Sequence, residues 1–92
     1  MTTSAKRFLI HGRVQGVGFR WWTSRQARRL GIEGTVRNRE DGTVEVQAVG
    51  PQDAMDSFAA ALGNGPAPAR VERVEAESLA SPPRVDGFQI LA

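Results

Sequence analysis

A short glycine-rich segment, VQGVGFRWW (residues 14–22), holds the residues whose types and spacing best suit chemistry. Gly16 and Gly18 are two residues apart, and glycine allows positive φ angles or the close approach of a ligand. Backbone N–H groups in such a loop, followed by the start of a helix, form a cradle for an anion. Arg20 would lie in the first helical turn, where a cation is unfavourable unless an anion binds beside it. The segment therefore predicts an anion site.

This segment has three other interpretations, and the sequence excludes two of them. It is not a dinucleotide-binding fingerprint, because position 21 is tryptophan rather than glycine, and it is not a Walker loop, because no Lys-Ser or Lys-Thr pair follows. It could still be a tight turn between a strand and a helix, with Arg20 on the surface. The choice between an anion site and a simple turn depends on which other residues reach the loop.

Asn38 is the second candidate, near the end of a strand predicted over residues 33–40. Val36 should face the helices, and side chains on a strand repeat every two residues, so Asn38 should face the same way. An inward amide without a hydrogen-bond partner carries a desolvation cost. Asn38 could instead be a turn residue, bonded to the backbone near Asp41 and Gly42. Both interpretations stay open at this point.

The chain offers few other catalytic groups. Its one histidine, His11, lies in a predicted strand, where a structural role or a position at the rim is expected. No side chains have the spacing of metal ligands, and there is no nucleophile–base pair. Of Trp21 and Trp22, we expect one to pack in the core and the other to lie on the surface. Chemistry here would rest on positioning and electrostatics, which suits a leaving group that needs no proton.

The elements that must position these residues follow from periodicity and turn signals. Strands are predicted at 6–12, 33–40, 43–50, 70–78 and 88–91, and helices at 19–30 and 52–62. This β-α-β-β-α-β order with a short final strand predicts an α+β fold, a two-layer α/β plait with both helices on one face of an antiparallel sheet. Strand 43–50 should lie between strands 6–12 and 33–40, which run parallel. The loop 13–18 and Asn38 then meet at one rim.

Composition sets the outer limits. The 92 residues make one domain, 1–92, and the absence of cysteine excludes disulfides and thiolate metal sites. With no apolar run long enough for a bilayer, we expect a soluble, cytoplasmic protein. Residues 1–39 hold nine Lys and Arg and one acid, whereas residues 40–92 hold three Arg and nine acids. This division indicates an anionic partner, although Arg25, Arg28 and Arg29 are expected to form an ordinary solvated helix face.

Two long motifs, GRVQGVGFR (12–20) and GTVRNREDGTVEV (34–46), resemble those of the acylphosphatase family, and GNGPAPARVERVE (63–75) is similar to a later segment of that family. The resemblance covers nearly the whole chain. It implies a ferredoxin-like fold and hydrolysis of the carboxyl-phosphate bond of acyl phosphates, giving a carboxylate and inorganic phosphate. It also implies no metal and no cofactor.

The resemblance assigns residue roles as well. It implies that Arg20 binds the phosphate and that Asn38 orients the attacking water. Its cradle of backbone N–H groups falls on six consecutive residues: Gln15, Gly16, Val17, Gly18, Phe19 and Arg20. Thr35 stands where many family members have an aromatic residue; this change could loosen the rim near Asn38 but touches neither Arg20 nor Asn38. The partners it implies are an acyl phosphate and inorganic phosphate, without nucleic acid or membrane, and we expect a monomer.

Two other classes of function are compatible with the element order. An RNA-binding module shares the order and would explain the basic half, but it stacks bases on aromatic residues of its first and third strands. Here the third strand, TVEVQAVG, has no aromatic residue and the first has only Phe8. A small regulatory domain could bind a phosphorylated metabolite without turnover. Turnover of a simple acyl phosphate distinguishes these classes.

Overall fold

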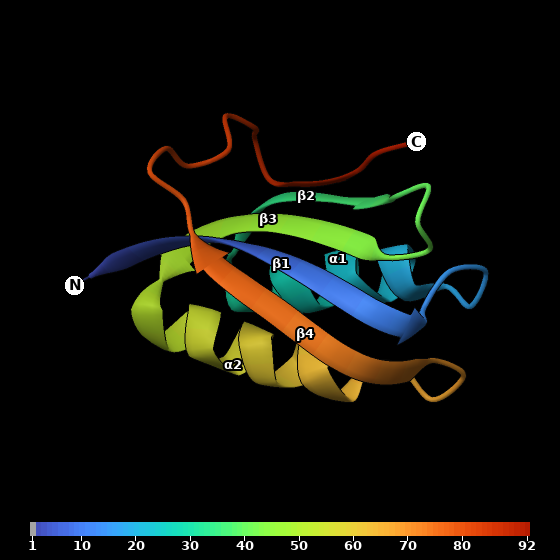
Figure 1. Cartoon of the computed structure of the whole chain (residues 1–92). Coiled ribbons are helices and arrows are strands. Elements are labelled where there is room, and N and C mark those ends of the chain that lie inside the picture. Colours follow the sequence, from blue (N-terminus) through green and yellow to red (C-terminus); the bar gives the residue numbers. More distant parts are fainter. Residues whose placement is uncertain (1) are drawn as a thin grey trace.

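Two helices cover one face of a five-stranded sheet in the computed structural model, which describes residues 2–92 (Figure 1). The elements are β1 (Thr3–Arg13), α1 (Phe19–Leu30), β2 (Glu33–Asn38), β3 (Val44–Pro51), α2 (Gln52–Asn64), β4 (Arg70–Ser78) and β5 (Phe88–Ile90). The predicted order and fold class are confirmed. The differences are at the ends: β1 is longer than predicted on both sides, and β2 ends at Asn38 rather than at residue 40.

The strand order across the sheet is β4-β1-β3-β2-β5, so β3 lies between β1 and β2 as predicted. β1, β3, β2 and β4 pair antiparallel with their neighbours, whereas β5 pairs parallel with β2 and makes the sheet mixed. The cause is the path of the chain. β4 runs opposite to β1 and β2, and the chain reverses once more before β5, which therefore runs in the direction of β2. In Figure 1 this last segment returns along the β2 edge.

The core lies between the sheet and the helices. Phe8 of β1, Phe58 of α2 and Phe88 of β5 are almost fully buried, and Phe58 meets the other two rings edge-on, at centroid distances of 6.0 and 6.1 Å. The inward side chains of β3, Val44, Val46 and Ala48, are completely buried beneath the helices. The core thus fixes α1 against β2, which is the pairing that positions the candidate site. Within residues 2–92, neither helix has the length and apolar character needed to cross a bilayer.

The face of the sheet without helices carries an ion network centred on Glu45, whose side chain is only 7% exposed. Nε of Arg7 donates to one carboxylate oxygen at 2.5 Å, and Nε of Arg37 donates to the other at 2.6 Å. Burial raises the pKa of Glu45, but the hydrogen bonds from Arg37 and Arg7 outweigh it and hold the pKa below its ordinary value. Folding therefore pairs part of the basic half of the chain with the acidic half.

Candidate active site

The loop between β1 and α1 forms one wall of the candidate site. Val14 anchors it in the core, with 1% of its side chain exposed. Gly16 and Gly18 have φ angles of +75° and +78°, in the left-handed region that favours glycine. Gly18 is the N-cap of α1, and no side chain among the described residues caps this helix. The first-turn N–H groups are therefore free to face an anion, as the sequence predicted.

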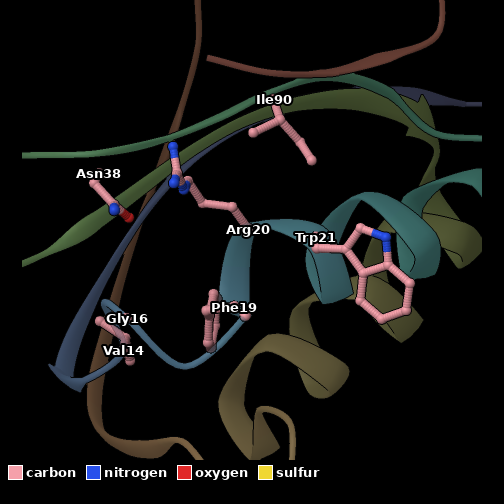
Figure 2. Close-up of a pocket in the computed structure, with 8 residues that line it drawn as sticks. Val14, Gly16, Phe19, Arg20, Trp21, Asn38 and Ile90 are labelled. Carbon is pink, nitrogen blue, oxygen red and sulfur yellow. The ribbon is translucent and has the colours of Figure 1, made fainter. Parts of the chain in front are cut away.

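Arg20 extends from the first turn of α1 toward Asn38 (Figure 2). Its Nη1 donates a hydrogen bond to the backbone carbonyl of Leu91 at 3.0 Å. Among residues 2–92, no carboxylate lies within 4.0 Å of its guanidinium, in contrast to Arg7 and Arg37. A carbonyl orients a guanidinium without cancelling its charge. The full positive charge of Arg20 therefore remains available to a ligand.

Asn38 is the last residue of β2, and its side chain faces the same pocket. Its Oδ1 is buried and has no hydrogen-bond partner within the described part of the chain. The hairpin does not use Asn38, because Asp41 makes the side-chain bonds there: Oδ1 of Asp41 accepts from the backbone N–H of Thr43 at 3.0 Å and from its hydroxyl at 2.6 Å. The turn interpretation of Asn38 therefore has no support, and an unused acceptor faces the pocket.

These residues enclose a pocket of about 190 Å³. It is lined by Val14, Gly16, Gly18, Phe19, Arg20, Trp21, Asn38 and Ile90 (Figure 2). The predicted meeting of the glycine loop, Arg20 and Asn38 at one rim is thus present in the structure. The volume lies below the range of roughly 300–1,000 Å³ that suits drug-sized ligands. A small anion is the better fit.

Two of the predicted cradle residues, Gln15 and Val17, do not line this pocket. Val17 packs against the core. The side chain of Gln15 donates two hydrogen bonds from Nε2, to the carbonyl of Arg39 at 2.8 Å and to that of Thr43 at 2.9 Å. It thereby ties the loop to the hairpin that follows Asn38. Sequence reasoning missed this bracing role because backbone carbonyls leave no mark on the residue pattern.

The structure also bears on the predictions for Trp21, Trp22 and Thr35. Trp21 is 59% exposed, and Trp22 packs on Phe19 with a centroid distance of 5.4 Å, so one tryptophan is on the surface and one is packed against the core, as predicted. Trp21 also lines the pocket. Thr35 pairs with Gln47 of β3, lies three residues before Asn38 on β2, and does not line the pocket. Its effect on the rim stays a prediction.

The titratable side chains with metal-binding potential lie elsewhere. His11 is hydrogen-bonded to Glu75 of β4 on the face of the sheet opposite the helices, in keeping with a structural role. Within residues 2–92, no three His, Cys, Asp or Glu side chains gather closely enough to hold a metal ion. The groups that line this pocket can bind an anion through backbone amides and a guanidinium, beside an amide oxygen that can accept a hydrogen bond from water.

Comparison with known proteins shows the family to which this chain belongs. A sequence model described as Acylphosphatase matches residues 6–90. An acylphosphatase of Nitrobacter hamburgensis is 51% identical over 81 residues, which cover 88% of this chain and 82% of the relative. One of Vibrio parahaemolyticus is 45% identical over 91 residues, covering 99% and 100%. The crystal structure of acylphosphatase from Bacillus subtilis matches with a TM-score of 0.91 at 35% identity, covering 99% of this chain and 100% of that one.

Proposed function

The chain belongs to the acylphosphatase family, and from this premise we propose that it hydrolyses the carboxyl-phosphate bond of acyl phosphates by in-line attack of water, without a metal ion. One observation carries the proposal. A single pocket combines an arginine that no carboxylate of the described chain neutralises, a helix start without a side-chain cap, and the unpartnered Oδ1 of Asn38. These are the groups that phosphoryl transfer by positioning and electrostatics requires.

The phosphoryl group would be held by the guanidinium of Arg20 and by backbone amides of the loop residues that line the pocket: Gly16, Gly18, Phe19 and Arg20. A guanidinium offers a planar fork to two phosphoryl oxygens, and charge-assisted hydrogen bonds of this kind are about twice as strong as neutral ones. The carbonyl of Leu91 holds the guanidinium in place, and Gln15 holds the loop against the hairpin. The cradle is therefore organised before substrate arrives, which lowers the cost of reorganisation during the reaction.

Asn38 would position the nucleophile. Its Oδ1 accepts a hydrogen bond from a water molecule, which turns a lone pair of that water toward phosphorus. A bond forms between the water oxygen and phosphorus while the bond from phosphorus to the acyl oxygen breaks, and the products are a carboxylate and inorganic phosphate, which keeps both protons of the water. The carboxylate leaves without a proton because the pKa of its conjugate acid is only about 4. No general acid is needed.

The test uses acetyl phosphate as substrate and two arginine variants. We expect hydrolysis to persist after exhaustive chelation, with inorganic phosphate as a competitive inhibitor. Arg20→Lys keeps the charge but loses the fork, so kcat/KM should fall by roughly 100-fold or more. Arg29→Lys, on the exposed side of the same helix, is the matched control and should not change it. Activity lost on chelation and restored by a divalent ion would overturn the proposed mechanism.

The RNA-binding alternative has less support in the fold. Such a module would present aromatic residues from β1 and β3 on the open face of the sheet. Phe8, the one aromatic residue of β1, is buried in the core, and the open face carries the Glu45 ion network. A regulatory domain without turnover would bind phosphate but fail the hydrolysis assay. We further propose a cytoplasmic monomer, which fits the single small domain and the sequence without cysteine.

A further inference from the structure

The last strand, β5, leads to the carbonyl that orients Arg20. Within residues 2–92, the hydrogen bond made by the side chain of Arg20 goes to the carbonyl of Leu91, the residue directly after β5. A guanidinium on a flexible stem points toward its fixed acceptor. Whatever holds β5 in place therefore also holds the guanidinium of the pocket in its orientation.

By its own contacts, β5 is weakly attached. It has three residues, pairs only with β2, and follows residues 79–87, which form no helix or strand. Phe88 is the one buried residue in the range 88–92. A short edge strand with few buried contacts opens locally at a small cost in free energy. The position of the Leu91 carbonyl therefore depends on additional contacts that keep β5 against the rest of the fold.

A second arginine of α1 supplies such a contact. Nη2 of Arg28 donates a hydrogen bond to the carbonyl of Phe88 at 3.3 Å. The donor is ionised, and hydrogen bonds of this kind are stronger than neutral ones. Arg20 and Arg28 are about two helical turns apart, so one helix holds the segment from Phe88 to Leu91 at both of its ends.

We propose that Arg28 is a positioning residue for the phosphate site. By holding the start of β5 against α1, it keeps the carbonyl of Leu91 where it orients the guanidinium of Arg20. This inference rests on the proposed function, because it takes Arg20 as the phosphate-binding group. Arg28 lies outside the catalytic pocket and borders a separate hollow at the other end of β5, so it acts through the strand and does not touch phosphate.

The test compares wild-type protein with Arg28→Ala. It measures the dissociation constant of inorganic phosphate by NMR titration, kcat/KM for acetyl phosphate, and the hydrogen-exchange rate of the Leu91 backbone N–H, which donates to the carbonyl of Val36 at 2.8 Å. Loss of one hydrogen bond shifts the closing equilibrium of β5 by up to about tenfold. In Arg28→Ala we expect exchange at Leu91 to be about three- to tenfold faster, and phosphate affinity and kcat/KM each to fall about threefold.

Two control variants separate positioning from a general loss of stability. Arg28→Lys can still donate to one carbonyl and should keep most of the wild-type phosphate affinity. Arg29 lies in the same last turn of α1, so Arg29→Ala loses the same interaction with the helix dipole, but within the described residues Arg29 makes no hydrogen bond to β5. It should leave all three quantities unchanged. Because coupling between two sites is reciprocal, saturating phosphate should also slow exchange at Leu91 in wild-type protein, which a purely structural bond would not cause.

Each outcome bears on a different claim. Unchanged phosphate affinity in Arg28→Ala, despite faster exchange at Leu91, would refute the positioning role, and so would equal losses in Arg29→Ala. If wild-type protein binds phosphate but does not hydrolyse acetyl phosphate, the proposed function fails, while the phosphate affinity of Arg28→Ala still decides the positioning role. Wild-type protein that neither binds phosphate nor hydrolyses acetyl phosphate would refute both.

Discussion

Replacing Asn38 with alanine should separate catalysis from stability. The substitution removes a buried oxygen that has no hydrogen-bond partner among residues 2–92, so no hydrogen bond within the protein is lost. In the proposed site this oxygen accepts a hydrogen bond from water, so alanine removes at most that one hydrogen bond, about 1 kcal/mol. The lost side-chain atoms lined an open pocket rather than the sealed core, so the cavity penalty is small. The free energy of unfolding should therefore change by no more than about 1 kcal/mol.

The turnover rate, unlike the free energy of unfolding, should fall steeply. If Oδ1 of Asn38 orients the attacking water, its loss should reduce kcat by roughly 10²–10³, or about 3–4 kcal/mol, as for other single polar groups that act in a preorganised site. Bound phosphate interacts with Arg20 and the loop instead, so its inhibition constant should change less than about twofold. This pattern, with turnover lost and ligand affinity kept, is the mark of an interaction made in the transition state.

Three measurements on one preparation distinguish a catalytic from a structural role of Asn38: kcat for acetyl phosphate, the inhibition constant of phosphate, and the urea midpoint. The matched control is Asn64→Ala, since Asn64 is exposed at the end of α2 and lies outside the pocket. It should leave the kinetics unchanged. A near-normal kcat together with a lowered midpoint in Asn38→Ala would show that Asn38 is a structural residue and would refute the reasoning.

Three further substitutions test the supports of the site. Glu45→Gln deprives two guanidinium groups of their carboxylate and should lower the free energy of unfolding by about 2–3 kcal/mol at pH 7, a reduced value for a buried pair because both arginines are partly exposed. The folded pKa of Glu45 lies below its ordinary value of 4.5, so its contribution to the free energy of unfolding is complete above pH 4.5 and is lost as the pH falls through the folded pKa. The urea midpoints of the two proteins should converge over that range, and a constant gap would contradict the assignment. Gln15→Leu removes the two hydrogen bonds from Gln15 Nε2 to the hairpin, so it should lower the free energy of unfolding by about 2 kcal/mol and weaken inhibition by phosphate. The control Gln52→Leu, at an exposed position, should do neither. Gly18→Ala places a side chain at a φ of +78°, where its Cβ would meet no atom within 4 Å. The free energy of unfolding should therefore fall by the backbone cost alone, about 1 kcal/mol. A larger fall would indicate a clash.

The pairing of Arg20 with Asn38 could be predicted because it depends on connectivity alone. Hydrophobic periodicity indicates the β-α-β-β-α-β order, and the crossover through residues 19–30 makes β1 and β2 parallel. The short Asp41-Gly42 hairpin then leaves β3 only one place, between them. Parallel strands end at the same edge, so the loop after β1 and the last residue of β2 must meet.

Contacts that depend on atomic positions could not be predicted. The segment 79–87 has no periodic pattern, so nothing indicated that β5 would pair with β2 and bring Ile90 and the carbonyl of Leu91 to Arg20. The brace from Gln15 ends on backbone carbonyls, which every residue has. The ion network of Glu45 requires the register of β3 against both neighbouring strands, and a slip of one residue would turn each side chain to the other face.

The hydrogen bond between Arg20 and Leu91 has a practical consequence for anyone who fuses, labels or immobilises this protein. The chain leaves the fold at Ala92 beside the rim of the pocket, in a hollow that Asn38 also borders. Figure 1 shows the start of β1 at the opposite end of the strands from the glycine loop. A tag, dye or surface linker attached after Ala92 would crowd Leu91, which holds the guanidinium of Arg20, and the rim beside Asn38. The same attachment ahead of Thr3 would leave the pocket open, and is the better choice for display or capture.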